Sequence, residues 1–241
     1  MPLVAVSLAA IAGACDGLAY LSLDNLFVAN QTGNVVLMGI SIINGQSFET
    51  ILHSVSLLAY IAGLALTGIL VERMVSAGIT RILPIIFALQ TLLILVAAVV
   101  AQQAGTDLAD STAVPVAGGL LAVAMGMQTV ALQKVGAWSI KTTFLNGMLS
   151  DGTLDIVARI IGRPRSTLVP DPRPLKIAVL AFLIVFTYLV GAAISAQLFN
   201  ARGSQGLFVV AAATLLLTLF TVRTEQPALD RRPTPSAPDQ P

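Results

Sequence analysis

The stretch FVANQTGNVVLMG, from Phe27 to Gly39, decides the fold because it places polar residues between two long apolar flanks. Asn30 precedes the run Gln31-Thr32-Gly33-Asn34, and both flanks have the character of membrane spans. Non-helical backbone at bilayer depth is tolerated only inside protein or beside water. The stretch therefore predicts a break in a helix that other helices surround. We expect Thr32 or Asn34 to cap a helix that begins near Val35.

Composition indicates that the surroundings are a lipid bilayer. Of the 241 residues, 56% are hydrophobic and only 10% are charged, whereas soluble domains carry about 25% charged residues. The net charge of +1 gives no reason to expect a nucleic-acid partner. Cys15 and His53 are each the only residue of their type, so we expect no metal and no cofactor; His53 is predicted to be interfacial.

The apolar segments predict an all-α, polytopic membrane helical bundle. Two regions, Met1–Ile43 and Ser111–Ser150, are about 40 residues each and would measure roughly 60 Å as single helices, so each must break or turn back. One net crossing for each gives six spans, and a seventh stays open because Asn25–Ile43 is just long enough to cross alone. The other four spans are predicted at Ile51–Val71, Ile82–Thr106, Ile177–Ala201 and Gly203–Val222.

Loop charges predict the orientation. Ten basic residues lie in alternate connections: two at positions 73 and 81, five between 159 and 176, and three after 222. The other loops carry a single basic residue, Arg202. By the positive-inside rule, the basic connections and the C-terminus are cytoplasmic, and we expect an integral protein of the cell membrane. Residues 1–223 form a single transmembrane domain, and the Pro-rich tail 224–241 is predicted to be disordered.

An internal repeat relates the two halves, 1–106 and 111–223. The motif GACD at Gly13–Asp16 corresponds to GMQT at Gly126–Thr129. Each half has three elements, and three crossings reverse the orientation of the second half, so the sequence predicts two inverted three-element repeats with broken first helices. The spans that follow also align, with small residues that allow close helix packing: Tyr60, Gly63 and Thr67 correspond to Tyr188, Gly191 and Ser195.

These motifs resemble those of the YoaK-like integral membrane family, known as domain of unknown function 1275. The first family motif is matched at Asp16, Ala29, Asn30, Thr32, Gly33 and Asn34. The second is matched at Met125, Gly126, Gln128, Thr142, Thr143 and Gly147, with Asn146 where a Thr is usual. The resemblance covers Val4–Val222. It implies the same architecture, and it adds almost nothing on substrate because the family's activity is unassigned.

Asp16 and the two breaks are the candidate functional features. An intramembrane carboxylate indicates proton coupling, cation binding or a buried partner, and Lys134 or Lys141 would be candidate partners in a structural role. The breaks enter from opposite faces and would meet in one midplane site, or would serve only as capped joints. The candidate substrate-binding residues are Asp16, Asn30, Gln31, Thr32, Gly33, Asn34, Gln128, Thr142, Thr143, Asn146 and Gly147.

The function predicted from this pattern is transport of a small solute or ion between the two repeats. The alternative is a membrane scaffold or assembly factor that transports nothing. The sequence lacks a nucleotide-binding motif, a metal-ligand cluster and a nucleophile with an evident base, so we expect no enzyme. The expected partners are the bilayer and a small molecule or ion, and the sequence leaves open whether the protein forms homo-oligomers.

Overall fold

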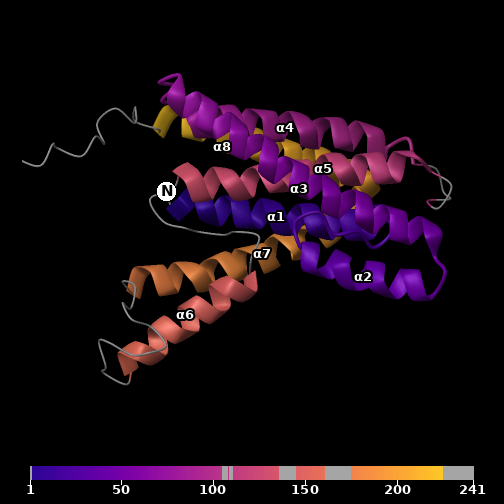
Figure 1. Cartoon of the computed structure of the whole chain (residues 1–241), viewed down its shortest axis with the longest axis horizontal. Coiled ribbons are helices and arrows are strands. Elements are labelled where there is room, and N and C mark those ends of the chain that lie inside the picture. The colour runs from indigo at the N-terminus through magenta and orange to yellow at the C-terminus, as the bar shows by residue number, and fades with distance from the viewer. Residues whose placement is uncertain (1, 105–107, 109–110, 136–144, 161–174, 225–241) are drawn as a thin grey trace, which may run out of the picture.

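The structure is a computed structural model that describes residues 2–104, 108, 111–135, 145–160 and 175–224. Within these residues all regular structure is helical (Figure 1), which confirms the predicted helical bundle. The elements are α1 (Pro2–Ser22), α2 (Gln31–Ile43), α3 (Ser47–Ser76), α4 (Ile82–Ala101), α5 (Ala113–Val135), α6 (Leu145–Ile160), α7 (Leu175–Arg202), the 3-10 turn η1 (Gly203–Gln205) and α8 (Gly206–Thr224). Except for Thr224, the predicted tail lies outside the described residues.

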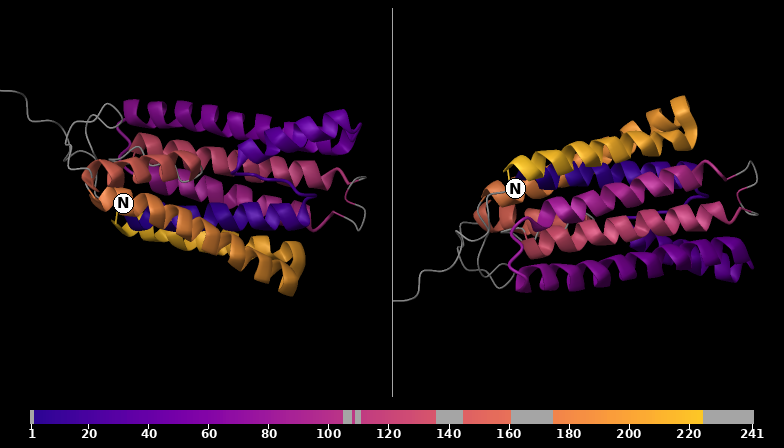
Figure 2. Two further views of the ribbon diagram at one scale, coloured as in Figure 1. Left: turned by 90° about the horizontal axis from the view of Figure 1, so that it is seen from below. Right: turned by 90° about the horizontal axis from the view of Figure 1, so that it is seen from above.

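Five apolar segments among the described residues are long enough to cross a bilayer. Four of them lie in α1, α3, α4 and α5, and the fifth, Ala178–Thr224, takes in most of α7 and all of α8. A segment of 47 residues would extend about 70 Å as one helix. The chain instead turns at Gly203, whose φ of +58° lies in the left-handed region that glycine adopts without strain. After this turn α8 runs back through the bundle, packed mainly against α4 and α1, and Figure 2 shows it in yellow.

The helices α2 and α6 are shorter than the candidate spans. α2 has 13 residues and measures about 20 Å, less than the roughly 30 Å of a bilayer core, so α2 by itself is too short for the seventh span that Asn25–Ile43 left open. α6 has 16 residues and extends to Ile160, beyond the end of the long region predicted at Ser111–Ser150. Figure 1 shows α6 running toward the N-terminal end of the bundle and α2 toward the opposite end.

The α1–α2 connection, residues 23–30, is the break that the sequence predicted, but it lies earlier than expected. α1 ends at Ser22, and Asp24 and Asn25 reverse the chain with φ of +56° and +60°. Asp and Asn tolerate this left-handed conformation better than most residues. Gln31–Asn34 form the first turn of α2, so the helix begins four residues before the predicted start near Val35. The non-helical residues therefore precede the polar run.

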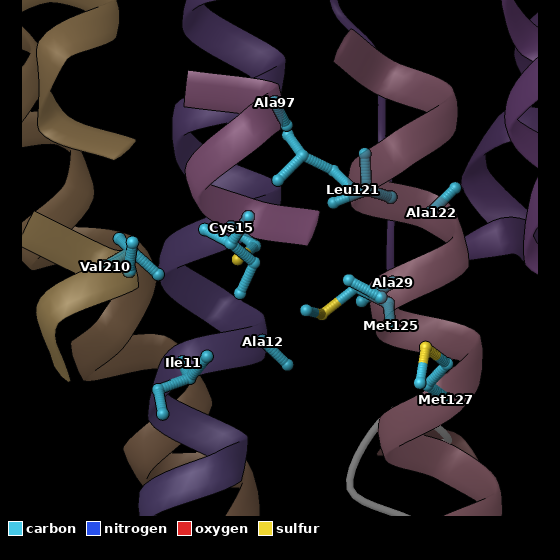
Figure 3. Packing of buried hydrophobic residues seen from close by; sticks show 14 of the residues in the cluster. Ile11, Ala12, Cys15, Ala29, Ala97, Leu121, Ala122, Met125, Met127 and Val210 are labelled. Atoms are coloured by element: carbon cyan, nitrogen blue, oxygen red, sulfur yellow. The ribbon is translucent and has the colours of Figure 1, made fainter. Parts of the chain in front are cut away.

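The core forms around the small residues of α1. Ala12 and Cys15 are fully buried, and Figure 3 shows them facing Met125 of α5, with Val210 of α8 on another side of α1. Short side chains on α1 let α7, α8 and α5 pack against this one helix. By contrast, α3 exposes most of its surface, as expected of a helix that contacts lipid.

Four glycines bring two pairs of helices into backbone contact. A Cβ at Gly13 of α1 would overlap the carbonyl of Tyr188 in α7, and one at Gly191 of α7 would overlap that of Ala10 in α1. In the same way, a Cβ at Gly63 of α3 would overlap the carbonyl of Val123 in α5, and one at Gly126 of α5 would overlap that of Tyr60 in α3. Each pair combines a helix from each predicted half, and the glycines that the repeat aligned occupy matching positions. The inverted orientation of the halves stays a prediction.

We predict that Gly63→Ala lowers the free energy of unfolding by about 1–3 kcal/mol, because the new methyl must displace the backbone of Val123. Gly68→Ala is the matched control: it lies on the same helix, and a Cβ there has no neighbour within 4 Å. Equilibrium unfolding in SDS, starting from detergent-solubilised protein, measures both. Equal stabilities would show that the α3–α5 crossing does not depend on a close backbone approach.

Candidate functional site

The site is built around the carboxylate of Asp16, which lies in the last third of α1 and is 3% exposed. Its Oδ1 accepts hydrogen bonds from the backbone N–H groups of Val28 at 2.7 Å and Ala29 at 2.6 Å. Its Oδ2 accepts one from the N–H of Asn30 at 3.0 Å and one from the hydroxyl of Tyr188 on α7. All four donors are neutral, and the described partners include no lysine; the side chains of Lys134 and Lys141 lie outside the described residues.

The position of Asp16 explains where α2 begins. Buried backbone N–H groups outside a helix need partners, and the N-cap residue Asn30 makes no side-chain capping bond. Asp16 supplies acceptors from a neighbouring helix to Asn30 and to the two residues before it. A negative charge at this place is also favoured by the dipole of α2. The expected caps, Thr32 and Asn34, are therefore not needed for capping.

Asn34 fixes the other side of the connection. Its Nδ2 donates to the carbonyl of Phe27 at 2.6 Å, and its Oδ1 accepts from the N–H of the same residue at 3.1 Å. Nδ2 also reaches Ser56 Oγ of α3 at 3.1 Å, and Ser56 donates to the carbonyl of Phe27 at 2.8 Å. Gln31 Nε2 donates to the carbonyl of Val28 at 3.0 Å. The polar run thus ties the connection to α3.

His53 of α3 also contacts this network, because its Nδ1 lies 3.3 Å from Asn34 Oδ1. It is 4% exposed, so its side chain lies inside the protein, and its predicted place at the membrane interface stays a prediction. Burial raises the pKa of the Asp24 carboxyl in the connection; the nearby Glu49 adds to this effect and His53 opposes it. Removing the charge of Asp24 should therefore disturb the fold little.

The remaining residues predicted in the first break are peripheral. Asn30 and Thr32 have exposed side chains. Gly33 is half-buried, and a Cβ there would lie 2.7 Å from the ring of Phe27. This position therefore requires glycine for space, within a regular helical turn and not within an unwound segment.

Gln128 belongs to a separate polar contact in the second half. It is fully buried, accepts a hydrogen bond from Gln90 of α4 at 2.8 Å and donates to the carbonyl of Leu8 at 3.0 Å. Leu8 precedes Asp16 by about two helical turns, or roughly 12 Å. Oε1 of Gln90 accepts no hydrogen bond from any described residue.

The second break is described only in part. Gly147 lies half-buried in the first turn of α6. Thr142, Thr143 and the side chain of Asn146 lie outside the described residues. The partners of Asp16, Gln31 and Asn34 come from the connection, α2, α3 and α7, so these contacts do not join the two breaks. A shared site stays a prediction.

The two aligned tyrosines make equivalent contacts. Tyr188 donates to Asp16, and the hydroxyl of Tyr60 lies 2.9 Å from that of Thr129. Asp16 and Thr129 occupy matching positions in the repeat. The sequence signal for Tyr188 was therefore present in the repeat alignment, whereas no pattern singled out Ser56 or Gln90.

Together these helices and the buried polar contacts define an α-helical, multi-pass integral membrane protein. Residues 4–221 match a family described as "Protein of unknown function (DUF1275)". The chain is 30% identical over 192 residues to the UPF0700 transmembrane protein YoaK of Bacillus subtilis (strain 168), covering 77% of this chain and 78% of that protein. No solved structure matches with significance. The chain therefore belongs to the DUF1275 family, as its motifs indicated, and that family is uncharacterised.

We predict that Asn34→Ala destabilises the fold by about 1–3 kcal/mol, because the N–H of Phe27 loses its side-chain acceptor and the carbonyl of Phe27 keeps only Ser56 as a donor. Thr32→Ala, an exposed position in the same helical turn, is the control and should change stability little. SDS unfolding of the two variants compares them directly. If both lose the same stability, Asn34 does not hold the connection.

Proposed function

We propose that the protein transports a small solute or ion by alternating access around the connection between α1 and α2. The observation that carries this proposal is the buried carboxylate of Asp16, which lies at the start of a short, non-crossing helix and is contacted by Tyr188 from the other half. Intramembrane carboxylates are costly and are typical of substrate or proton pathways. A broken helix that meets a polar group in this way is a common plan for secondary transporters.

The two short helices give further support. α2 and α6 run toward opposite ends of the bundle, as half-helices of inverted repeats do (Figure 1). Each packs on the spanning helix that follows it: Ser56 and Asn34 join α2 to α3, and Gly152 of α6 lies against Ala181 and Phe182 of α7. We propose that Gly147 and Asn146, at the start of α6, complete the site that Asp16 and Asn34 begin.

The arrangement of the ends supports the orientation that the loop charges predicted. The start of α1 and the end of α8 lie at the same end of the bundle, with the end of α3 beside them (Figure 2). Arg73 and Arg81 flank the α3–α4 connection at that end. We propose that this end faces the cytoplasm of a cell whose plasma membrane holds the protein, and that the protein performs no catalysis.

A scaffold or assembly role is the second candidate, and one observation favours it. Each oxygen of Asp16 already accepts two hydrogen bonds, so in this conformation the carboxylate has no free position for a cation or a solute. A structural joint would have this property. A transporter must break some of these bonds during its cycle.

We predict that purified protein in nanodiscs is stabilised thermally by at least one member of a panel of inorganic ions, amino acids, organic acids and sugars, and that proteoliposomes take up the same compound. The triple variant Asp16→Asn, Thr32→Ala, Asn146→Ala should lower that uptake at least about tenfold. Asp24→Asn is the control, because this side chain lies in the same connection but contributes no bond to the network around Asp16.

Stabilisation and uptake that survive the triple variant would place the site elsewhere. No ligand response and no uptake, combined with a partner protein that co-purifies in a fixed ratio, would favour the scaffold.

A further inference from the structure

We propose that Asp16 is a proton-sensitive switch: its carboxylate form holds the α1–α2 connection against α1 and α7, and protonation releases the connection. As the coupling step of transport, this inference rests on the function proposed above. As a conformational change it is measurable without any transported compound.

The bonding of Asp16 is the first argument. An ionised carboxylate only accepts hydrogen bonds and offers about four lone-pair positions, and three N–H groups and one hydroxyl occupy them. A protonated carboxyl must instead donate one hydrogen. The N–H groups of Val28, Ala29 and Asn30 cannot become acceptors, whereas the Tyr188 hydroxyl can rotate to accept. Protonation therefore reverses the bond to Tyr188 and removes the charge that strengthens the bonds to the connection.

The attachments of the connection determine what moves. Asp16 ties it to α1, and through Tyr188 to α7. Asn34 and Ser56 tie it to α3. Only the contacts made by Asp16 depend on the charge of a carboxylate. Protonation therefore leaves the connection and α2 attached to α3, and weakens their attachment to α1 and α7, which the glycine contacts hold together.

The surroundings contain few groups that compete for the proton. On α1 the neighbour is Cys15, a buried thiol, and on α7 it is Tyr188. From α3, His53 contacts Asn34 of the network, and the charges of Asp24 and Glu49 interact with His53. The helices α5 and α8 contain no Asp, Glu, His or Tyr, and their basic residues, Lys134 and Arg223, lie near their C-terminal ends.

Hydrogen–deuterium exchange of the full chain in nanodiscs tests the switch, because the bonded groups are backbone amides. We expect the peptide that covers residues 26–30 to be protected at pH 8 and to lose at least about tenfold of that protection as the pH falls toward 4. Rates are corrected for the intrinsic pH dependence of exchange. A peptide from the middle of α5 serves as the internal reference and should keep its protection.

Asp16→Asn, which resembles the neutral acid, should exchange rapidly in the same peptide at every pH. Tyr188→Phe keeps the three N–H bonds and should remain protected at pH 8. Asp24→Asn, which removes a carboxylate from the same connection without touching these bonds, should behave like the unmodified protein.

Protection of residues 26–30 that does not change between pH 8 and pH 4 in the unmodified protein would overturn the proposal, and this measurement needs no variant that must fold. Protection of Asp16→Asn equal to that of the unmodified protein would overturn it as well. A pH-dependent switch in a protein without uptake supports the switch and counts against transport. Uptake by a protein whose protection does not change with pH supports transport and overturns the switch.

Discussion

The hydrogen bonds between Asp16 and the three successive N–H groups before α2 are the interaction on which the rest of this structure depends. Inside a bilayer, each of these groups would cost several kcal/mol if it had no partner. Asp16 is far enough from the end of α1 to draw the connection back into the bundle. The place where α2 begins follows from that contact, and Asn34 and Ser56 then hold α2 against α3.

A second constraint determines which helices are neighbours. The backbones of α1 and α7 meet at Gly13 and Gly191, and those of α3 and α5 meet at Gly63 and Gly126. Because apolar surface gains little by burial within a membrane, close packing at small residues directs helix association there. Both crossings join the two halves of the chain, so neither half can form these glycine contacts by itself. The tyrosines beside these crossings place a hydroxyl on Asp16 in one case and on Thr129 in the other.

The difference between these two positions bears on function. Thr129 donates to the carbonyl of Met125 in its own helix and contacts Tyr60, so its contacts involve no change of charge. At the matching position, Asp16 carries a carboxylate that can gain a proton. It binds the α1–α2 connection, which Asn34 and Ser56 attach to α3. The only described carboxylate on α1 therefore lies where a change of charge would affect the contact between the two halves.

The sequence by itself determined the membrane class, the helical bundle, the break in the first long region, and Asp16 as the residue of interest, because these follow from local composition, length and motif. It also marked the glycines and tyrosines of the repeat. Only the tertiary structure decided that the break ends before Gln31, that Tyr188, 172 positions away, bonds to Asp16, and that His53 is buried against Asn34. These features depend on partners from distant helices, and local patterns of polarity do not specify which helix supplies a partner.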